Sequence, residues 1–492
     1  MKHYDPVTSV TVSSDFRALR VRYVPVVLLA LVIVLHLPGL NNRVFNNDEA
    51  YIATVADVLA HGGRLYVDVV DRKPPGVFYI YHWLFELTGS TALWIPRLAA
   101  MVAHAATATL VWVFARRRLG DRAALVAGVL AAITSATVTP GDAQTAEFEV
   151  FMMPFIVGAM VLADRRKPFA SGVAIGAGTM MKQTAATTLL PLAWMAWRHR
   201  DSRWRNLVLL GAGGAVPVAL CAVLFNPGRF WFWVFGGANG GYLDVGKGGF
   251  GIVADRMLSM NGAVIALNLG VLALAALSVR SWRADLDIWL WLLSAVIGVA
   301  SGTRFFGHYY WQLFPPLCLL AARGATVIGA RWTRLAVGAA ALTAAGAAIA
   351  AAMFRIGGPS NDYNAIADYA KAHTTPDERI FVWGHEPSVF WAADRLPASR
   401  IITTGFLTGH TAVRPKGFDG MDKAVPGLWD DVMADLEAHP PTLFFNTEPI
   451  DPSESADYPI RDYPPMAQFI AERYELVDMI GKVSVYKLMV AS

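Results

Sequence analysis

The run LWIPRLAAMVAHAATATLVWVF, from Leu93 to Phe114, is apolar almost throughout, and the basic segment Arg116 to Arg118 begins two residues after it. A helix needs roughly 20 such residues to cross a bilayer. Comparable runs recur along most of the chain. They cover residues 23–39, 93–114, 123–137, 148–163, 169–197, 207–225, 264–279, 288–299, 311–322 and 335–353. The sequence therefore predicts a polytopic α-helical membrane protein.

The composition supports this fold class. Of the 492 residues, 55% are hydrophobic and only 16% are charged, which is unlike a soluble chain of this length. These values exclude a cytosolic enzyme and a nucleic-acid binder, and the net charge of +4 comes from basic segments between apolar runs. Both cysteines, Cys221 and Cys318, lie inside apolar runs, so we expect neither a disulfide framework nor redox chemistry.

The basic segments predict the topology, because Lys and Arg accumulate on cytoplasmic loops. Residues 1–22 form a polar leader before an uncleaved first span, so we expect the N-terminus in the cytoplasm. The other segments expected to face the cytoplasm fall at alternate connections, at residues 116–122, 165–167, 198–205, 280–283 and 323–334.

The run at 169–197 has basic segments on both sides, so it must cross twice, with its turn at Lys182-Gln183-Thr184 near the outer face. Counting it as two passes gives about eleven spans in a transmembrane domain of residues 23–353, with the C-terminus outside. The expected outward segments are residues 41–91, 138–147, the Lys182 turn, 226–261 and 302–310.

The first outward loop, residues 41–91, carries the most informative pattern. Asp48 and Glu49 precede apolar residues at helical spacing (52, 55, 56 and 59), which predicts an amphipathic helix on the membrane surface. The acidic start is either a helix cap, made by Asn47 or Asp48, or a chemical site. The segment Asp71-Arg72-Lys73-Pro74-Pro75 leads into a second surface helix, and a turn with snorkelling cations is its simpler interpretation.

Further polar residues fall on the same expected face. Lys182 interrupts an apolar hairpin, where an ionisable residue is costly. Arg304, His308 and Tyr309 fill a short outward turn, and Glu147 and Glu149 open a span. Taken singly, these residues fit an aromatic belt, an anchoring cation and helix-terminal acids. Together they place acids and cations around one outward cavity, where cations suit a phosphate and a carboxylate suits a base.

Residues 354–492 are predicted to form a small extracytoplasmic α/β domain. The expected helices are 361–373, 387–394, 428–438 and 465–474, the expected strands are 379–383, 400–404 and 442–446, and residues 475–488 are β-rich. No nucleotide-binding loop follows these strands, and the segment offers neither a metal-ligand cluster nor an acid in a setting that suggests a perturbed pKa. We expect this domain to dock the acceptor or to cover the cavity.

The order of these features resembles the GT-C glycosyltransferases of the protein O-mannosyltransferase and aminoarabinose transferase (PMT/ArnT-like) group. The residues that carry the resemblance are Asp48-Glu49, Lys73-Pro74-Pro75, Arg97, Glu149 with Val-Phe-Met-Met, Lys182-Gln183, His308-Tyr309-Tyr310 with Pro315-Pro316, and the tail segments Phe381–Gly384 and Pro397–Arg400. One departure is that aminoarabinose transferases carry an acid directly before Lys-Pro-Pro, where this chain has Arg72, with Asp71 one residue further back.

The resemblance implies an inverting transfer from a polyprenyl-phosphate sugar donor to an acceptor hydroxyl of a cell-envelope glycan or glycolipid, with Asp48 as the general base. The expected donor-phosphate site is Lys182, Arg304, His308 and Tyr309. Sugar or acceptor contacts are expected from Glu49, Asp71, Lys73, Glu149 and Tyr242, the last in a glycine-rich loop (236–251) that would order on substrate binding. A divalent metal is left open, and no other cofactor is expected.

The expected location is the cytoplasmic (inner) membrane, with active site and C-terminal domain on the periplasmic side, among membrane lipids and away from nucleic acid. A protein O-glycosyltransferase of the same mechanism is one alternative. A lipid or polysaccharide transporter or flippase is another, but it predicts midplane charges and an internal repeat. A membrane anchor that displays a binding module is a third, and it leaves Lys182 unexplained.

Overall fold

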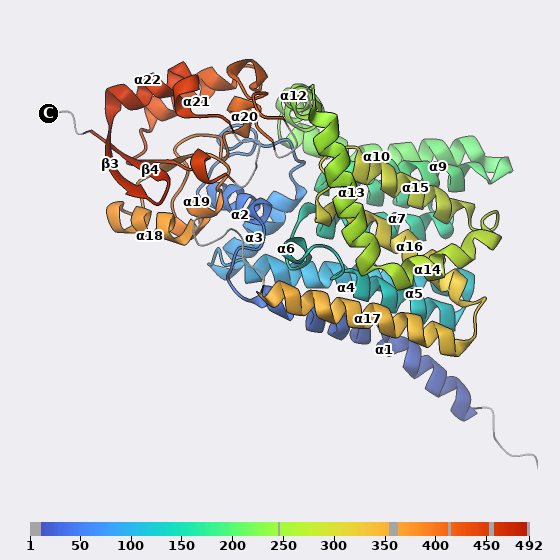
Figure 1. Ribbon diagram of the computed structural model, residues 1–492. Coiled ribbons are helices and arrows are strands. Elements are labelled where there is room, and N and C mark those ends of the chain that lie inside the picture. Colours follow the sequence, from blue (N-terminus) through green and yellow to red (C-terminus); the bar gives the residue numbers. More distant parts are fainter. Residues whose placement is uncertain (1–10, 245–246, 354–362, 412–414, 452–456, 490–492) are drawn as a thin grey trace, which may run out of the picture.

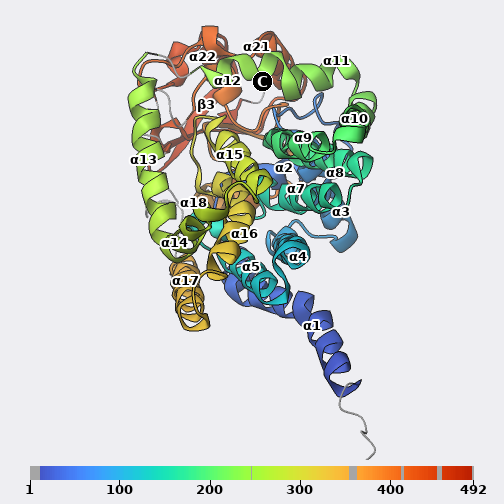
Figure 2. The ribbon, with the colours of Figure 1, turned by 90° about the vertical axis from the view of Figure 1, so that its right-hand side faces the viewer.

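The computed structural model describes residues 11–244, 247–353, 363–411, 415–451 and 457–489. Figure 1 shows a bundle of roughly parallel helices, with a smaller α/β part at one end. The α/β part is built from the C-terminal residues and rests on the first loop of the bundle, as the view turned by 90° in Figure 2 also shows. The two predicted parts of the chain are therefore both present and in contact.

The bundle helices lie mostly where apolar runs occur. They are α1 (Thr11–His36), α4 (Trp94–Leu119), α5 (Asp121–Thr134), α7 (Phe148–Asp164), α8 (Pro168–Met181), α9 (Leu189–Trp197), α10 (Arg203–Leu224), α13 (Gly249–Leu267), α14 (Leu269–Leu277), α15 (Leu286–Ala300), α16 (Phe314–Ala325) and α17 (Ala330–Met353). The described part of the predicted polar leader, from Thr11, is helical and continuous with α1.

Four of the described helical segments are long and apolar enough to cross a membrane by length and composition, at Trp94–Leu119, Arg200–Leu224, Gly249–Leu267 and Ala330–Met353. The prediction of a multi-pass membrane protein is confirmed. The count of eleven spans stays a prediction, since several of the expected spans are helices of only 9–17 residues.

The predicted hairpin at 169–197 is present. α8 ends where Lys182 takes an extended backbone conformation, the 3-10 helix η2 (Gln183–Thr188) turns the chain, and α9 returns. Residues from the start of α8 and the end of α9 line one cavity, so α8 begins and α9 ends at the same side of the bundle. A side chain at Gly172 or Gly213 would collide with the backbone of the facing helix, so small residues let α8 and α10 pack closely.

The predicted outward loop at 226–261 is wrong in part. It contains α11 (Pro227–Phe230), the π-helix η4 (Trp231–Phe235) and α12 (Gly237–Leu243), and α13 then begins at Gly249. Figure 1 shows α13 crossing the bundle helices at a steep angle. The predicted span 264–279 is interrupted at Asn268, between α13 and α14. The Asn268 side chain accepts a hydrogen bond from the Thr137 hydroxyl (2.7 Å) and donates one to the Thr137 carbonyl oxygen (3.1 Å).

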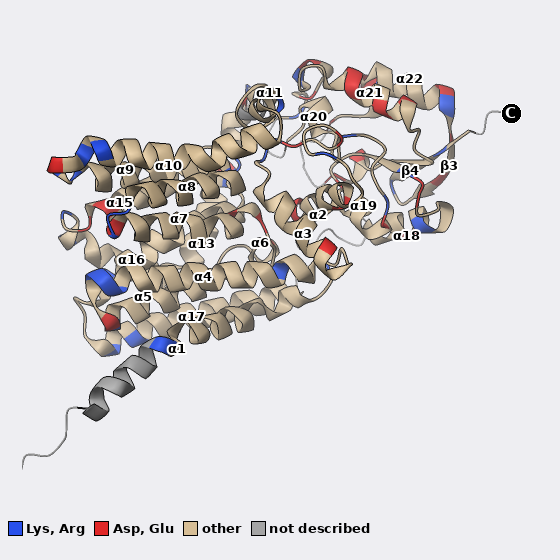
Figure 3. Ribbon diagram, turned by 180° about the vertical axis from the view of Figure 1, so that it is seen from behind, with Lys and Arg blue, Asp and Glu red and all other residues tan. Residues whose placement is uncertain are grey.

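The basic connections gather at the end of the bundle away from the C-terminal part, as Figure 3 shows. Arg118 contacts Asp164 and Asp287 (2.8 and 2.7 Å), and Arg323 contacts Asp285 (2.7 Å). These pairs join connections that are far apart in the sequence. The basic connections, which occur at alternate turns along the sequence, therefore lie at one end of the bundle, as the sequence predicts.

The C-terminal part is a mixed sheet with helices, in the strand order β1-β2-β4-β3. Its strands are β1 (Ile380–Trp383), β2 (Leu443–Asn446), β3 (Tyr474–Ile480) and β4 (Val483–Leu488). β1 and β2 are parallel, and the other neighbours are antiparallel. Its helices are α18 (Tyr363–His373), α19 (Ser388–Ala393), α20 (Gly405–Thr408), α21 (Leu428–Ala438) and α22 (Pro464–Arg473).

The predicted strand at 400–404 is wrong. Pro397 forms only an isolated bridge with Ile380, and proline has no N–H with which to extend a ladder. The chain then leaves the sheet, and the Arg400 carbonyl accepts a hydrogen bond from Val70 of the first loop (3.0 Å). This segment therefore joins the domain to the bundle.

The first loop contains α2 (Asn47–Ala60) and α3 (Gly76–Thr88). The prediction that α2 lies on the membrane surface with one face buried is not supported, because nearly all of its residues are buried between α3 and α19. In α3, Trp83 and Leu87 are strongly exposed and one helical turn apart, as expected for a helix that presents an apolar face to lipid.

Candidate active site

Asp48 lies in the first turn of α2 and opens onto a cavity. The cap of this helix is Asn46, whose side-chain oxygen accepts a hydrogen bond from the Asp48 N–H (2.9 Å). Neither residue expected as the cap is used, so the Asp48 carboxylate is available for other contacts. Its side chain is 55% exposed. A half-exposed carboxylate at a helix N-terminus can be both ionised and reachable by a substrate.

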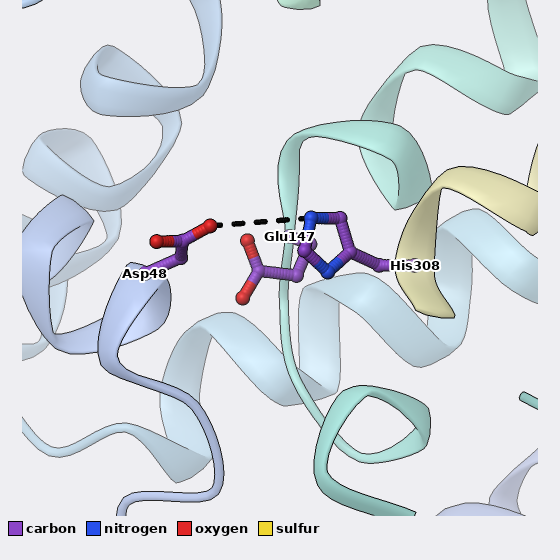
Figure 4. A group of neighbouring side chains, drawn as sticks. All are labelled: Asp48, Glu147 and His308. Carbon is purple, nitrogen blue, oxygen red and sulfur yellow. Dashed lines mark ion pairs between the residues drawn. The ribbon is translucent and has the colours of Figure 1, made fainter. Parts of the chain in front are cut away.

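Three side chains from distant parts of the sequence converge at this point. Figure 4 shows Asp48 from α2, Glu147 from the loop before α7, and His308 from the 3-10 helix η6 (Gly307–Leu313). Oδ2 of Asp48 lies 3.9 Å from Nε2 of His308, and one ligand atom of each residue lies within 4.8 Å of the other two. We call these residues the triad.

His308 is held from behind by Asp142 of α6 (Pro140–Ala143), whose Oδ1 lies 2.8 Å from Nδ1 of the imidazole. The same oxygen accepts a hydrogen bond from the Asn46 side chain (2.6 Å). A side chain at Gly307 would collide with Thr139 and Asp142, which explains a glycine here. Nε2 of His308 is thereby directed toward Asp48.

Burial and neighbouring charges shift the pKa values of the residues in this cluster. Burial alone would lower the pKa of His308, but the carboxylates of Glu149 and Asp142 raise it to about 9, so the imidazole holds a proton at neutral pH. Burial raises the pKa of Glu147 well above its usual range, with His308 opposing and Asp48 adding to the shift. Neither carboxylate oxygen of Glu147 has a hydrogen-bond partner among the described residues.

The triad fits a divalent cation. A buried carboxylate without partners, a second carboxylate and an imidazole nitrogen form a donor set that suits zinc or manganese. The hydrogen bond from Nδ1 of His308 to Asp142 has the form of the carboxylate–histidine contacts that orient metal ligands. A bound cation would favour the ionised form of Glu147, which burial disfavours.

The cavity beside Asp48 has a volume of about 180 Å³ and lies between the bundle and the C-terminal domain. The bundle supplies the charged side chains of its wall, which are Asp48, Asp71, Arg72, Lys73 and Arg304. Phe148, Phe306 and Tyr309 add aromatic surface. The structure therefore brings together five of the residues predicted for the site: Asp48, Asp71, Lys73, Arg304 and Tyr309.

The opposite wall of the cavity comes from the C-terminal domain, with His385, Thr403, Phe406 and His410 among its residues. The expectation that this domain lacks acids in unusual settings is wrong. Asp419 contacts Nδ1 of His410 (2.9 Å), and burial raises the pKa of Glu386 to about 7. These residues are scattered over the domain sequence, so no local motif predicts that they lie at one site.

Lys182 does not line the cavity. It is buried, forms an ion pair with Glu149, and its Nζ lies 4.0 Å from the centre of the Tyr309 ring. The expected contacts of Lys182 with phosphate and of Glu149 with sugar are therefore not supported. The pair lies behind Tyr309 instead and neutralises two charges that would be costly if buried singly.

Glu49 is also directed away from the cavity. Its carboxylate is fully buried and pairs with the guanidinium of Arg97 through two hydrogen bonds (2.9 and 2.5 Å), and it accepts the Ala146 N–H (3.1 Å). The predicted sugar or acceptor contact of Glu49 is not supported. The pair instead fixes the start of α2, on which Asp48 lies, against α4.

The Lys-Pro-Pro segment is held by the hairpin turn. Gln183 donates a hydrogen bond to the Arg72 carbonyl (2.6 Å), and Asp71 accepts one from the Lys73 N–H (2.5 Å). A Cβ at Gly76 would lie 2.6 Å from the Met180 carbonyl oxygen, so glycine permits this approach. Asp71 thus reaches the cavity despite its shifted place in the motif.

Tyr242 and Glu147 both lie in segments expected on the outer face. Tyr242 lies in α12, but its side chain is outside the part of the chain that the structure describes. The sequence predicts a sugar or acceptor contact for Glu149 and no site role for Glu147. In the structure Glu147 belongs to the triad, whereas Glu149 pairs with Lys182. The two residues differ because residues two apart at a helix start face different directions.

Comparisons with known proteins agree with this picture. Residues 72–226 match the family model of dolichyl-phosphate-mannose-protein mannosyltransferases. The fold is similar to ArnT from Cupriavidus metallidurans bound to undecaprenyl phosphate (14% identity, TM-score 0.60, 94% of this chain and 97% of that chain). It is also similar to the Archaeoglobus fulgidus oligosaccharyltransferase in complex with Zn and sulfate (14% identity, TM-score 0.56, 86% and 68%). No curated protein matches the sequence. The resemblance drawn from the order of motifs is confirmed.

Proposed function

We propose that the chain is a glycosyltransferase similar to the dolichyl-phosphate-mannose-protein mannosyltransferases and to ArnT, with a polyprenyl-phosphate-linked sugar as donor. It transfers one sugar, with inversion, to a hydroxyl of a cell-envelope glycan or glycolipid. The observation that carries this proposal is the placing of Asp48 and three cationic side chains around one cavity.

Asp48 is the general base. Its carboxylate takes the proton of the acceptor hydroxyl, the oxygen attacks the anomeric carbon, and the bond from that carbon to the phosphate oxygen breaks. Nε2 of His308 lies 3.9 Å from Oδ2 of Asp48 and can contact the same substrate groups. With His308 deprotonated, Asp48, Glu147 and His308 would be able to hold a divalent cation, and the chemistry it would supply is Lewis-acid stabilisation of phosphate charge.

The phosphate of the donor binds to the cationic wall. Arg304 is buried and lines the cavity with Arg72 and Lys73, so charge that develops on the departing polyprenyl phosphate meets guanidinium and ammonium groups away from bulk water. Tyr309 completes this wall. Lys182 lies behind this wall, where it contacts the Tyr309 ring and pairs with Glu149, and has no direct part in this scheme.

The acceptor enters from the side of the C-terminal domain. His385, Thr403 and His410 offer hydrogen-bonding groups opposite Asp48, which suits a hydroxylated acceptor. An acceptor protein hydroxyl would use the same chemistry and remains the alternative. We propose further that residues 23–353, with loop 41–91, form the catalytic unit and that the C-terminal domain (354–492) covers it. The pattern of basic segments supports a C-terminal domain on the outer side of the cytoplasmic membrane, about eleven spans and the N-terminus inside.

The test is transfer by purified Asp48→Asn protein, which should bind donor normally and lose activity by about two to four orders of magnitude, the usual scale for a positioned base. Glu86→Gln on the exposed part of α3 is the matched control and should behave as the unaltered chain. Substantial transfer by the Asp48 variant would remove the proposed mechanism.

A further inference from the structure

A cavity of about 610 Å³, larger than the one beside Asp48, lies at the opposite end of the bundle. It opens between α8, α9 and the start of α10, and we call it the basic cavity. Its rim carries Arg166, Arg198, His199, Arg200 and Arg205, against the single acid Asp201. Its floor is apolar and buried, with Leu192, Met195, Ala196 and Leu210.

The rim has an excess of positive charge. The nearby acids Asp164 and Asp287 are bound at 2.7–2.8 Å by Arg117 and Arg118, and Arg198 is 3.6 Å from Asp287. Within the described residues, Arg166, Arg200 and Arg205 make no ion pair at all. Partial burial lowers the pKa of His199, and the charges of Arg166 and Arg198 lower it further. An anion would therefore be attracted to this rim.

The surroundings of the basic cavity are those of a membrane surface. Trp197 and Trp204 lie beside it, 37% and 64% exposed, with the Arg203 guanidinium 4.7 Å from the Trp197 ring centre. Exposed tryptophans of this kind occur at the headgroup level of bilayers. Val208 exposes an apolar side chain one turn further along α10, and Leu189 exposes one at the far end of α9. A soluble anion would use only the rim, whereas a lipid headgroup with its chains would use the rim and the apolar surface.

We propose that the basic cavity binds the phosphate headgroup of an anionic phospholipid, in the leaflet opposite the proposed active site. The guanidinium groups bind phosphate oxygens through paired hydrogen bonds, and the acyl chains follow the exposed apolar faces of α9 and α10. This site is separate from the sugar-transfer cavity and does not depend on the reaction proposed for it.

The experiment compares two triple variants of the full chain. Arg166→Gln, Arg200→Gln and Arg205→Gln remove three rim charges. Arg122→Gln, Arg331→Gln and Arg334→Gln remove three exposed charges at the same end but outside the cavity. Binding of phosphatidylglycerol and of phosphatidylcholine is titrated by native mass spectrometry, and inorganic phosphate is added as a competitor.

Each cation near a lipid surface contributes roughly a fivefold change in affinity, so the rim variant should bind phosphatidylglycerol about 100-fold more weakly. The control variant should stay within about threefold of the unaltered chain, because its charges act only at a distance. Phosphatidylcholine should bind weakly to all three proteins, and millimolar phosphate should not displace phosphatidylglycerol. An equal loss in both variants, or no preference for the anionic lipid, would overturn the proposal.

Displacement by phosphate alone would show a site for a soluble anion and would equally overturn it. Should the triple variant fail to fold, the single exposed change Arg200→Glu gives the same comparison, with Arg331→Glu as control. Sugar transfer measured without anionic lipid should be unchanged in the rim variant, because no rim residue lies near Asp48.

Discussion

The Asn47 side chain donates a hydrogen bond to the backbone carbonyl of His385 (3.1 Å), and so joins the residue before the proposed base to the C-terminal domain. Both residues line the cavity. The same junction includes Trp391, whose indole N–H donates to the Thr91 carbonyl (2.9 Å). The position of Asp48 relative to the acceptor wall is therefore set by contacts between the first loop and the last domain.

Asn47→Ala should lower transfer by about two- to tenfold, the effect of one hydrogen bond, mainly through a raised KM for the acceptor. The donor wall does not depend on this bond, so slow hydrolysis of the donor should be unchanged. Steady-state kinetics with varied acceptor measure this, and Asn206→Ala at the far end of the bundle is the control. A loss of donor hydrolysis equal to the loss of transfer would show that the bond serves the donor side.

Glu49→Gln should destabilise the protein by about 3–5 kcal/mol, since it leaves Arg97 buried without its counter-charge. Thermal unfolding in detergent measures this. Asp48→Asn, one residue away, should leave the unfolding temperature nearly unchanged because its side chain is half exposed. If Glu49→Gln unfolded normally but failed to transfer sugar, Glu49 would belong to the chemistry after all.

Loss of Arg304 and loss of the Lys182–Glu149 ion pair should have different effects on donor affinity. Arg304→Gln should weaken donor affinity by about tenfold or more, as for a charged hydrogen bond to phosphate. The double variant Lys182→Met and Glu149→Met removes both charges of the buried pair together and should stay within about threefold in donor affinity, because neither residue lines the cavity. Titration with a polyprenyl-phosphate sugar analogue distinguishes the two. Equal weakening would return Lys182 to the phosphate site.

Zinc binding to the triad should strengthen with pH. His308, with a pKa of about 9, must lose its proton to act as a ligand, so affinity should rise about tenfold per pH unit up to that value. Isothermal titration from pH 7 to pH 9 measures this slope. Glu147→Gln should abolish tight binding, whereas Glu386→Gln, a buried acid outside the triad, should not. A pH-independent affinity would place the metal elsewhere.

A cysteine at Lys482, exposed in the turn between β3 and β4, should react with a membrane-impermeant maleimide in intact cells. The expectation follows from the placing of the C-terminal domain outside the cytoplasm. The unaltered chain is the control, since Cys318 is buried and Cys221 half-buried. Reaction seen only after lysis would reverse the assigned side of the whole active site.

The sequence by itself determined the membrane class, the alternation of bundle ends and the hairpin turn at Lys182. These depend on local features, namely the length of an apolar run and the charges at its two ends, which act through the bilayer without any long-range contact. The position and order of motifs also pointed to Asp48, which lines the cavity and whose role as the base is our proposal.

Only the tertiary structure decided which charged residues face the cavity. Asp48 and Glu49 are adjacent in sequence, yet one opens onto the cavity and the other pairs with Arg97. Lys182 meets Glu149, and Glu147 and His308 meet Asp48, only after helices remote in sequence have packed. A carboxylate's role is set by its burial and its partners, and these depend on long-range packing that no local pattern encodes.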